Sequence, residues 1–187
     1  MPSRSHMKRA FVAARLPDAV LDALEKRVSD LDIPGRPTTR DQWHLTMQFL
    51  GDAVDVGPVV SALEGIEAAG GRARLGGAGA FHAVEAANVL WLGLTEGSEF
   101  IARLAEAVAE LTAPLGIERS ARSFRPHLTL ARFRARTDVS GLIEAIGDAP
   151  VGPEWEVDAI TVFESELHPE GARYFERATI ALPQLPR

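Results

Sequence analysis

Apolar residues recur along the chain with two different spacings. The helical spacing of three and four positions predicts helices over residues 17–31, 56–68, 98–115 and 139–146. Alternating or short apolar runs bounded by turn residues predict strands over residues 8–16, 42–50, 72–82, 88–95, 126–133, 155–167 and 172–182. Because helices are interspersed with strands that pair as hairpins, we expect an α+β fold with mostly antiparallel sheets.

The segment 42–50 alternates strictly between polar and apolar residues. Successive side chains of a strand point to opposite faces of the sheet. The alternation therefore predicts that Trp43 and Phe49 belong to the core. It places His44, Thr46 and Gln48 together on the other face.

One short repeat stands out from the rest of the chain. His44-Leu45-Thr46-Met47 recurs as His127-Leu128-Thr129-Leu130, 83 residues later. Both copies lie on predicted strands, where His and Thr two positions apart share a face at about 7 Å spacing. A single His-x-Thr is common in half-buried strands, but its duplication on two similar strands favours a shared functional role.

Two such strands facing one cleft would present two imidazoles and two hydroxyls to a single ligand. Threonine hydroxyls can donate hydrogen bonds to phosphate oxygens. One neutral imidazole can accept a proton from an attacking group, and a protonated one can give a proton to the leaving oxygen. Each such role is typically worth about 10²–10⁴ in rate. This chemistry requires no metal ion.

Composition and length narrow the class of protein. With 187 residues, 46% hydrophobic and 25% charged, we expect one bilobal domain over residues 8–187. We interpret residues 1–7 as a tag remnant or a disordered N-terminus. The chain has no cysteine, which excludes disulfides and thiol nucleophiles and fits a reducing compartment. No uncharged run is long enough to span a membrane, and we expect a cytoplasmic monomer.

The net charge of −6 conceals an uneven distribution. Six arginines and no acid lie between residues 119 and 137, which leaves 14 basic and 26 acidic residues elsewhere. An acidic protein does not coat nucleic acid nonspecifically, but the local positive segment can attract one phosphate-bearing ligand. A solvated arginine face is the alternative interpretation.

Several enzyme classes lack their signatures in this sequence. There is no His-Glu-x-x-His, no clustered Asp and His, and no Gly-x-x-x-x-Gly-Lys-Ser/Thr phosphate loop. The only lysines, Lys8 and Lys26, have no nucleotide-binding context. We therefore expect neither a resident metal nor a cofactor.

The repeat and its flanking segments resemble the two-histidine (2H) phosphoesterase superfamily. Within it, the chain is similar to the RNA 2′,3′-cyclic phosphodiesterases, also called 2′-5′ RNA ligases. The resemblance spans about residues 8–182 in the same order. It rests on the repeat itself, on Arg-Ala-Phe-Val-Ala at 9–13, on Gly-Ala-Arg-Tyr at 171–174, and on the segments 43–51 and 124–132.

This resemblance implies a bilobal, pseudo-twofold fold with a central cleft. It implies opening of a terminal 2′,3′-cyclic phosphate on RNA to a 2′-phosphate without a metal, and a slow, reversible 2′-5′ joining of ends. By the same resemblance, His44 and His127 are the acid and base, and Thr46 and Thr129 hold the phosphate. For hydrolysis we assign the acid role to His44, which protonates O3′, and the base role to His127.

Four neighbouring residues are further candidates for substrate binding. Arg125 is in phase with His127, and Gln48 is in phase with His44. Arg132 matches an arginine that follows the second motif in the family, but strict alternation places it on the face opposite His127, so it needs a bulge or a position at the strand end. Tyr174 can stack on a base or pack in the last hairpin.

The histidine pair recognises only the phosphate, so it does not identify the rest of the substrate. The partners we expect are RNA ends or small nucleotides that carry a 2′,3′-cyclic phosphate. Alternative substrates are a small cyclic nucleotide, ADP-ribose cyclic phosphate or a 2′-5′ oligoadenylate. An RNA-end binding module without catalysis is the alternative from another class.

Overall fold

The structure is a computed structural model that describes residues 8–120, 123–168 and 171–184. Residues 1–7, for which the sequence suggests a tag remnant or a disordered N-terminus, lie outside the described residues, as does Arg122 of the arginine-rich segment. The other five arginines of that segment are described.

Strands and helices alternate along the chain as the spacing of apolar residues predicts. The strands are β1 (Arg9–Ala14), β2 (Arg36–Pro37), β3 (Leu45–Asp52), β4 (Gly71–Phe81), β5 (Ala87–Glu96), β6 (Leu128–Thr137), β7 (Pro150–Val157), β8 (Ala159–His168) and β9 (Gly171–Ala181). The helices are α1 (Asp18–Val28), α2 (Val56–Leu63), α3 (Ser98–Thr112) and α4 (Ser140–Ile146), with short 3₁₀ turns at Arg40–Gln42, Val84–Ala86 and Ala113–Leu115. All four predicted helices are confirmed, each of them shorter than expected.

The strands form two sheets, and every pairing described is antiparallel. One sheet has the order β3-β1-β8-β9, and the other has the order β2-β6-β5-β4-β7. In each sheet the motif histidine directly precedes a strand that carries the motif threonine, and this strand pairs with one earlier in the chain, β3 with β1 and β6 with β5. The α+β class and the duplicated, two-lobed architecture are confirmed.

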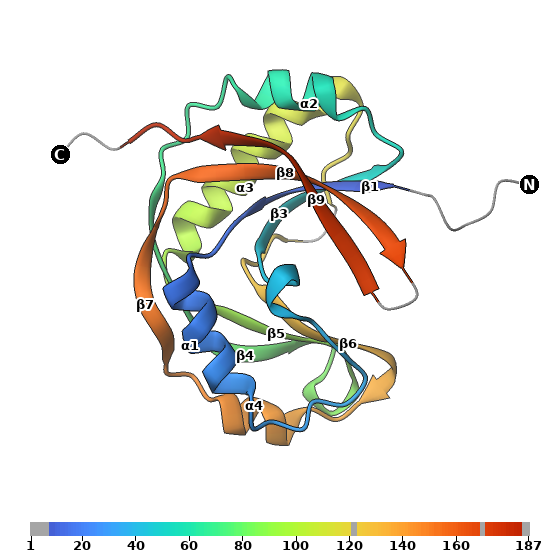
Figure 1. Cartoon of the computed structure of the whole chain (residues 1–187), viewed down its shortest axis with the longest axis vertical. Helices are drawn as coiled ribbons and strands as arrows, with labels where there is room; N and C mark the ends of the chain where they lie inside the picture. The colour runs from blue at the N-terminus through green and yellow to red at the C-terminus, as the bar shows by residue number, and fades with distance from the viewer. Residues whose placement is uncertain (1–7, 121–122, 169–170, 185–187) are drawn as a thin grey trace, which may run out of the picture.

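The prediction of one continuous strand over 155–167 is wrong. The chain breaks at Asp158, so that β7 lies at the edge of the five-stranded sheet while β8 lies inside the four-stranded sheet. Figure 1 shows β7 running along one side of the molecule from one sheet to the other. Apolar residues continue on both sides of the break, and hydrophobic spacing does not reveal that a chain changes sheets.

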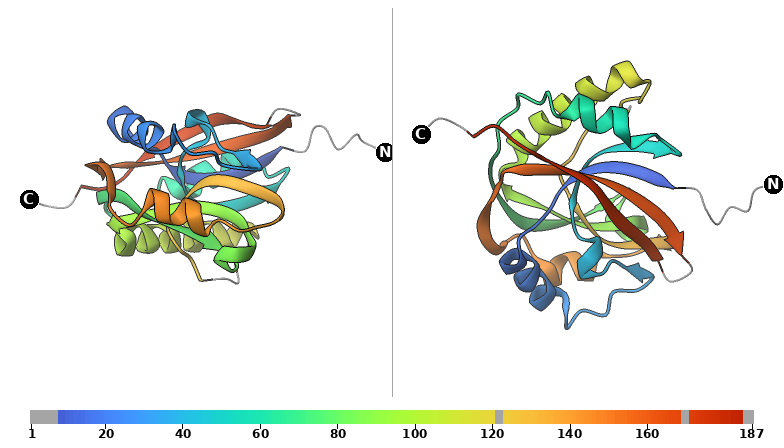
Figure 2. Two further views of the ribbon diagram at one scale, coloured as in Figure 1. Left: turned by 90° about the horizontal axis from the view of Figure 1, so that it is seen from below. Right: turned by 45° about the horizontal axis from the view of Figure 1, so that its top comes forward.

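The helices cover the outer faces of the two sheets. In α3, Ile101, Leu104 and Val108 are buried at helical spacing, and this face packs near α2 and β3. Helix α1 packs on β7, and α4 packs on β4. Figure 2 shows α2 with α3 at one end of the molecule and α1 with α4 at the other. The inner faces of the two sheets therefore face each other.

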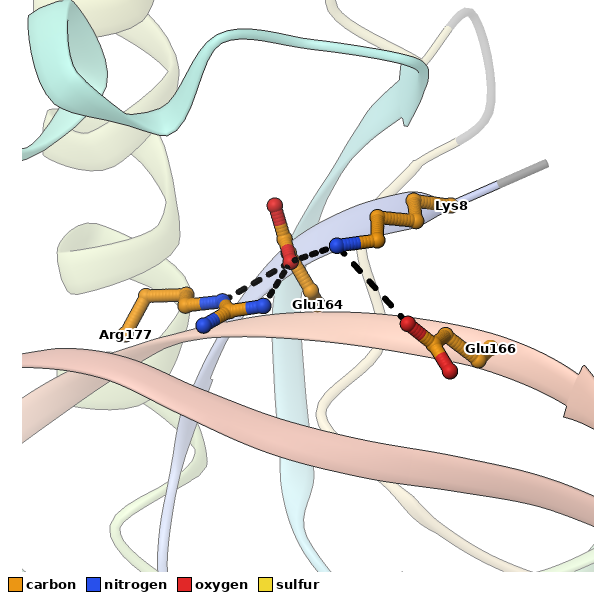
Figure 3. A network of polar contacts seen from close by, with 4 residues as sticks. All are labelled: Lys8, Glu164, Glu166 and Arg177. Atoms are coloured by element: carbon orange, nitrogen blue, oxygen red, sulfur yellow. Dashed lines mark hydrogen bonds and ion pairs between the residues drawn. The ribbon is translucent and has the colours of Figure 1, made fainter. Parts of the chain in front are cut away.

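The two faces of the four-stranded sheet differ in chemistry. Phe163 stacks on Phe11 on the inner face, and Glu164 points to the opposite face because side chains alternate along β8. There the Glu164 carboxylate accepts from Arg177 and Lys8, and Lys8 also pairs with Glu166 (Figure 3). Such ion pairs contribute little to stability. Glu164 and Glu166 lie on the face opposite Phe163, and neither of them lines a cavity described below.

Candidate active site

The two motif strands face each other across one cavity. A cavity of about 400 Å³ is lined by His44 and Thr46 from the first motif and by Thr129 and Arg132 from the second. A second cavity, of about 800 Å³, extends from His127 and Thr129 to α3. The side chains that line both cavities are Thr46, Phe49, Thr129 and Arg132. The duplicated motif is therefore brought together in space, as the sequence predicted.

A β-bulge interrupts the alternation in the first motif strand. Thr46 and Gln48 pair with consecutive residues of β1, which leaves Met47 as the extra residue. The prediction that Gln48 shares the face of His44 is therefore wrong. Gln48 is buried, its Oε1 accepts a hydrogen bond of 2.8 Å from Thr112 Oγ1, and it borders only the second cavity. Phe49, predicted to be core, is instead 66% exposed and lines both cavities.

The second motif strand carries the same bulge at the equivalent position. Thr129 and Ala131 pair with consecutive residues of β5, so Leu130 is the extra residue. Of the two alternatives for Arg132, a bulge that turns it inward is the one observed. The Arg132 side chain joins His127 and Thr129 on the cavity face, where its guanidinium group lies with the phosphate-binding candidates.

Both imidazoles are oriented by a backbone group two residues earlier in the chain. His127 Nδ1 lies 2.7 Å from the carbonyl oxygen of Arg125. His44 makes a hydrogen bond with the backbone of Gln42, and this bond raises the pKa of His44, as a carbonyl acceptor does. A neutral ring that donates through Nδ1 keeps Nε2 as an acceptor. This is the state that a general base needs.

The pKa values of both histidines are lowered. Burial is the main cause for His44, whose pKa falls to about 4, and the positive charge of Arg132 and the proximity of His127 lower it further. Burial also lowers the pKa of His127, with added contributions from Arg132 and Arg125. Both rings are therefore neutral near pH 7 in the free protein. An anion bound between them would raise both values.

The two histidines have different aromatic neighbours. His44 stacks on Phe11 with ring centroids 4.8 Å apart, and Tyr174 meets it edge-on at 5.2 Å. His127 meets Phe81 edge-on at 4.8 Å. Tyr174 lines the His44 cavity, where burial raises the pKa of its hydroxyl. It packs against the ring of Phe11 as well as that of His44, so it helps to fix the position of the imidazole.

Arg125 lies at the edge of the site rather than at its centre. Its side chain is exposed, and its guanidinium carbon lies 5.3 Å from the centroid of the Trp91 ring. It borders the second cavity, and its backbone carbonyl is the group that orients His127. Among the residues described, it forms no salt bridge with a carboxylate.

Comparisons with known proteins agree with this geometry. The family model described as the 2′-5′ RNA ligase superfamily matches residues 7–169. The chain belongs to this superfamily. It is 31% identical to the RNA 2′,3′-cyclic phosphodiesterase of Aquifex aeolicus, over 89% of this chain and 93% of that protein. It is 32% identical to the protein of the same name from Escherichia coli, over 80% of this chain and 81% of that protein.

Solved structures of the superfamily share the whole fold. Escherichia coli LigT complexed with 3′-AMP superposes with a TM-score of 0.78 and 27% identity, over 96% of this chain and all of that one. The Thermus thermophilus protein TT0787 superposes with a TM-score of 0.74 and 30% identity, over 94% of this chain and 98% of that one. The similarity therefore covers both lobes and both motifs.

Sequence reasoning missed several residues that line the two cavities. Arg9, Phe11 and Arg36 line the His44 cavity, and Phe81 borders the second cavity. For Arg36 no signal existed, because it lies in the two-residue strand β2, which reaches the site only through its pairing with β6. For the bulge of β6 there was a signal: the adjacent apolar residues Leu130 and Ala131 break the alternation.

Two further features concern metals and membranes. Within residues 8–120, 123–168 and 171–184, no group of three or more His, Cys, Asp or Glu side chains is arranged to hold a metal ion. In the same part of the chain, no helix has the length and apolar character needed to cross a membrane.

Proposed function

We propose that this protein hydrolyses the terminal 2′,3′-cyclic phosphate of RNA and leaves a 2′-phosphate. The observation that carries the proposal is the meeting of His44, Thr46, His127 and Thr129 from two different sheets around adjoining cavities. Arg132 supplies a fixed positive charge beside them. The arrangement fits a small anionic group that has one bond to be broken and one to be formed.

The proposed reaction adds one water across one P–O bond. His127 Nε2 accepts a proton from the water whose oxygen attacks phosphorus. The bond from phosphorus to O3′ breaks, and His44 gives its proton to O3′. The Thr46 and Thr129 hydroxyls and the Arg132 guanidinium group hold the non-bridging oxygens as charge builds on them. The products are a 3′-hydroxyl and a 2′-phosphate, and no metal takes part.

The lowered pKa of His44 sets a condition on this mechanism. An acid must carry a proton, and free His44, with a pKa of about 4, is neutral near pH 7. The phosphate anion bound beside it has to raise that pKa. The ring is positioned for this by the Gln42 backbone, whose hydrogen bond favours the protonated form.

The names of the relatives support the substrate. The proteins of Aquifex aeolicus and Escherichia coli are both RNA 2′,3′-cyclic phosphodiesterases. LigT has been crystallised with 3′-AMP, a nucleotide whose phosphate is bonded to O3′ of the ribose. Slow 2′-5′ joining of RNA ends would use the same groups, with the 5′-hydroxyl of a second RNA attacking phosphorus in place of water while the bond to O3′ breaks, and we include it in the proposal.

We also propose that residues 8–187 act as one bilobal domain in a monomer. One cluster of buried apolar residues includes members of both sheets, among them Val12, Leu45, Leu90 and Leu128. Both motifs and both cavities come from a single chain. A cytoplasmic location, expected from the absence of cysteine, stays a prediction.

The test uses a short RNA that ends in a 2′,3′-cyclic phosphate, with EDTA present. The expected product is a 2′-phosphate, identified by its resistance to enzymes that remove only 3′-phosphates. In parallel assays, a small cyclic nucleotide, ADP-ribose cyclic phosphate and a 2′-5′ oligoadenylate are offered. If the protein hydrolyses one of these compounds faster than the RNA, that compound and not RNA is the substrate. If the protein binds RNA ends without hydrolysing them, and His44→Ala binds them equally well, the protein is a binding module and not an enzyme.

A further inference from the structure

Two arginines that line the His44 cavity lie directly opposite each other in the five-stranded sheet. Arg36 of β2 is the register partner of Arg132 of β6, and both line the cavity. Opposed residues of an antiparallel pair have Cα atoms about 4.5–5.5 Å apart, and like charges in this position destabilise a sheet. A pair of this kind needs negative charge nearby.

The protein does not supply that charge through ion pairs. Across the residues that the structure describes, neither Arg36 nor Arg132 forms a salt bridge with a carboxylate. Nearby arginines do: Arg9 pairs with Asp52 at 3.0 Å, and Arg40 contacts a group of three acids on α1, namely Asp18, Asp22 and Glu25. Of the three described arginines that line the His44 cavity, Arg36 and Arg132 are thus the two left for a ligand.

The segment that carries Arg36 is fixed against the second motif. Thr38 N donates to Leu130 O at 2.8 Å, and Thr38 Oγ1 lies 2.7 Å from Thr129 O. Trp43 Nε1 in turn donates to Thr38 Oγ1 at 3.0 Å. These contacts engage the backbone at the bulge of β6. The position of Arg36 relative to Thr129 is therefore set before any ligand binds.

The guanidinium group of Arg36 lies close to the start of β9. A Cβ placed on Gly171 would be 3.4 Å from Arg36 Nη2 and 3.2 Å from Gln42 Nε2. Gln42 Nε2 donates to Ala172 O at 2.8 Å. Gly171 has a φ of +146°, a conformation that side chains rarely adopt. The absence of a side chain there leaves space for the Arg36 head beside the cavity.

We propose that Arg36 binds the phosphodiester that precedes the terminal nucleotide, so that the protein prefers an RNA end over a cyclic mononucleotide. The inference rests on the proposed function, because the cyclic phosphate must occupy the site between the histidines. Thr46, Thr129 and Arg132 serve that phosphate. Arg36, one strand further out, is placed for the next phosphate along the chain, and a guanidinium group can bind it through two parallel hydrogen bonds.

The experiment compares two substrates that differ by one phosphodiester. One is uridine 2′,3′-cyclic phosphate, and the other is the dinucleotide UpU with the same cyclic end. The ratio of their kcat/KM values is measured for the parent, Arg36→Ala, Arg36→Lys and the control Arg103→Ala. Arg103 is exposed on α3 and lines neither cavity, so its removal changes net charge equally.

The parent is expected to prefer the dinucleotide, and Arg36→Ala to lower that preference about 10- to 100-fold, the usual effect of losing a hydrogen bond to a charged group. Arg36→Lys should recover part of it, and Arg103→Ala should keep it. The salt dependence of dinucleotide binding should also weaken in Arg36→Ala, its slope falling by about 0.7 for one lost phosphate contact. An unchanged ratio in Arg36→Ala would overturn the proposal.

Binding measurements separate this proposal from the proposed function. UpU and uridine, each carrying a 2′-phosphate, are titrated calorimetrically into the same variants. If the parent hydrolyses neither cyclic substrate but Arg36→Ala selectively weakens the UpU ligand, the reaction is wrong and the second phosphate site stands. If both ligands weaken equally, Arg36 does not read the second phosphate.

Discussion

The two halves of the site present the same His-x-Thr pair but differ at the third residue after the threonine. That residue is Phe49 in the first half and Arg132 in the second, and an identical bulge brings each of them onto the cavity face. The shared residues suit the single phosphate that we propose they hold. The differing residues make one wall apolar and the other cationic, so a symmetric fold offers an asymmetric ligand two distinct walls.

The two imidazoles also have different surroundings. His44 lies against Phe11 and Tyr174, and its pKa falls to about 4. His127 lies near Phe81 and is oriented by the backbone carbonyl of Arg125, whose positive charge also lowers the pKa of His127. The duplicated motif therefore provides two chemically equal groups, and their neighbours place them in unequal surroundings.

Removal of either histidine tests whether the two halves act on one phosphate. His44→Ala and His127→Ala are each expected to lower kcat/KM for the RNA cyclic phosphate about 10²–10⁴-fold. The double variant should lose far less than the product of the two single losses, because the groups serve one transition state. The assay is steady-state hydrolysis, with His168→Ala, which lines neither cavity, as the control. Fully multiplicative losses would contradict a joint site.

The difference between Arg132 and Phe49 predicts unequal effects at equivalent positions. Arg132→Ala should lower kcat about 10²–10³-fold, since it removes a charged donor to the transition state. Phe49→Ala should act mainly on KM, because Phe49 offers only an apolar surface to the nucleotide. Initial rates across substrate concentration separate the two parameters. Equal losses in kcat from both variants would show that Phe49 and Arg132 contribute equally to the chemical step, which would contradict the proposed difference between the two walls.

The contacts at the β6 bulge predict an effect on stability. Thr38→Val removes the hydroxyl beside Thr129 O and Leu130 O, and it leaves Trp43 Nε1 without its acceptor. Unsatisfied groups of this kind cost about 1–3 kcal/mol. Urea denaturation should show this loss in the free energy of unfolding. Thr95→Val, at an exposed position, should change it by less than about 0.5 kcal/mol.

The lowered pKa of His44 predicts a smaller, pH-dependent effect. The folded value, about 4, is below the ordinary value near 6.5, so the neutral ring contributes stability that is complete above pH 6.5 and is lost as the pH falls toward 4. The Tm of the parent should therefore fall more between about pH 7 and about pH 4.5 than that of His44→Gln. If both proteins lose the same number of degrees, desolvation of His44 does not contribute.

The sequence was sufficient for the motif pair and for most elements. Repetition of His44-x-Thr46 at His127-x-Thr129 identified two strands of one site, because strand periodicity is local and keeps its phase over four residues. The phase failed one residue later. In β3 the polar Gln48 hides the bulge, since its hydrogen bond with Thr112 is a tertiary contact that local sequence does not record.

Residues brought in by long-range pairing were outside the reach of the sequence. Arg36 reaches the site because β2 pairs with β6, far along the chain. Phe81 reaches the site from the end of β4. The sequence predicted this strand but not which residues it would lie beside. The break at Asp158 was missed for the same reason: which sheet a strand joins depends on partners distant in sequence.

The most direct test of unequal roles uses an RNA whose 3′ oxygen in the cyclic phosphate is replaced by sulfur. A thiolate leaves without a proton, so this substrate needs a base but no acid. His44→Ala should hydrolyse it at a rate within about tenfold of the parent, while His127→Ala stays about 10²–10⁴-fold lower. Equal losses in both variants, or recovery of His127→Ala instead, would contradict the assignment of His44 as acid and His127 as base.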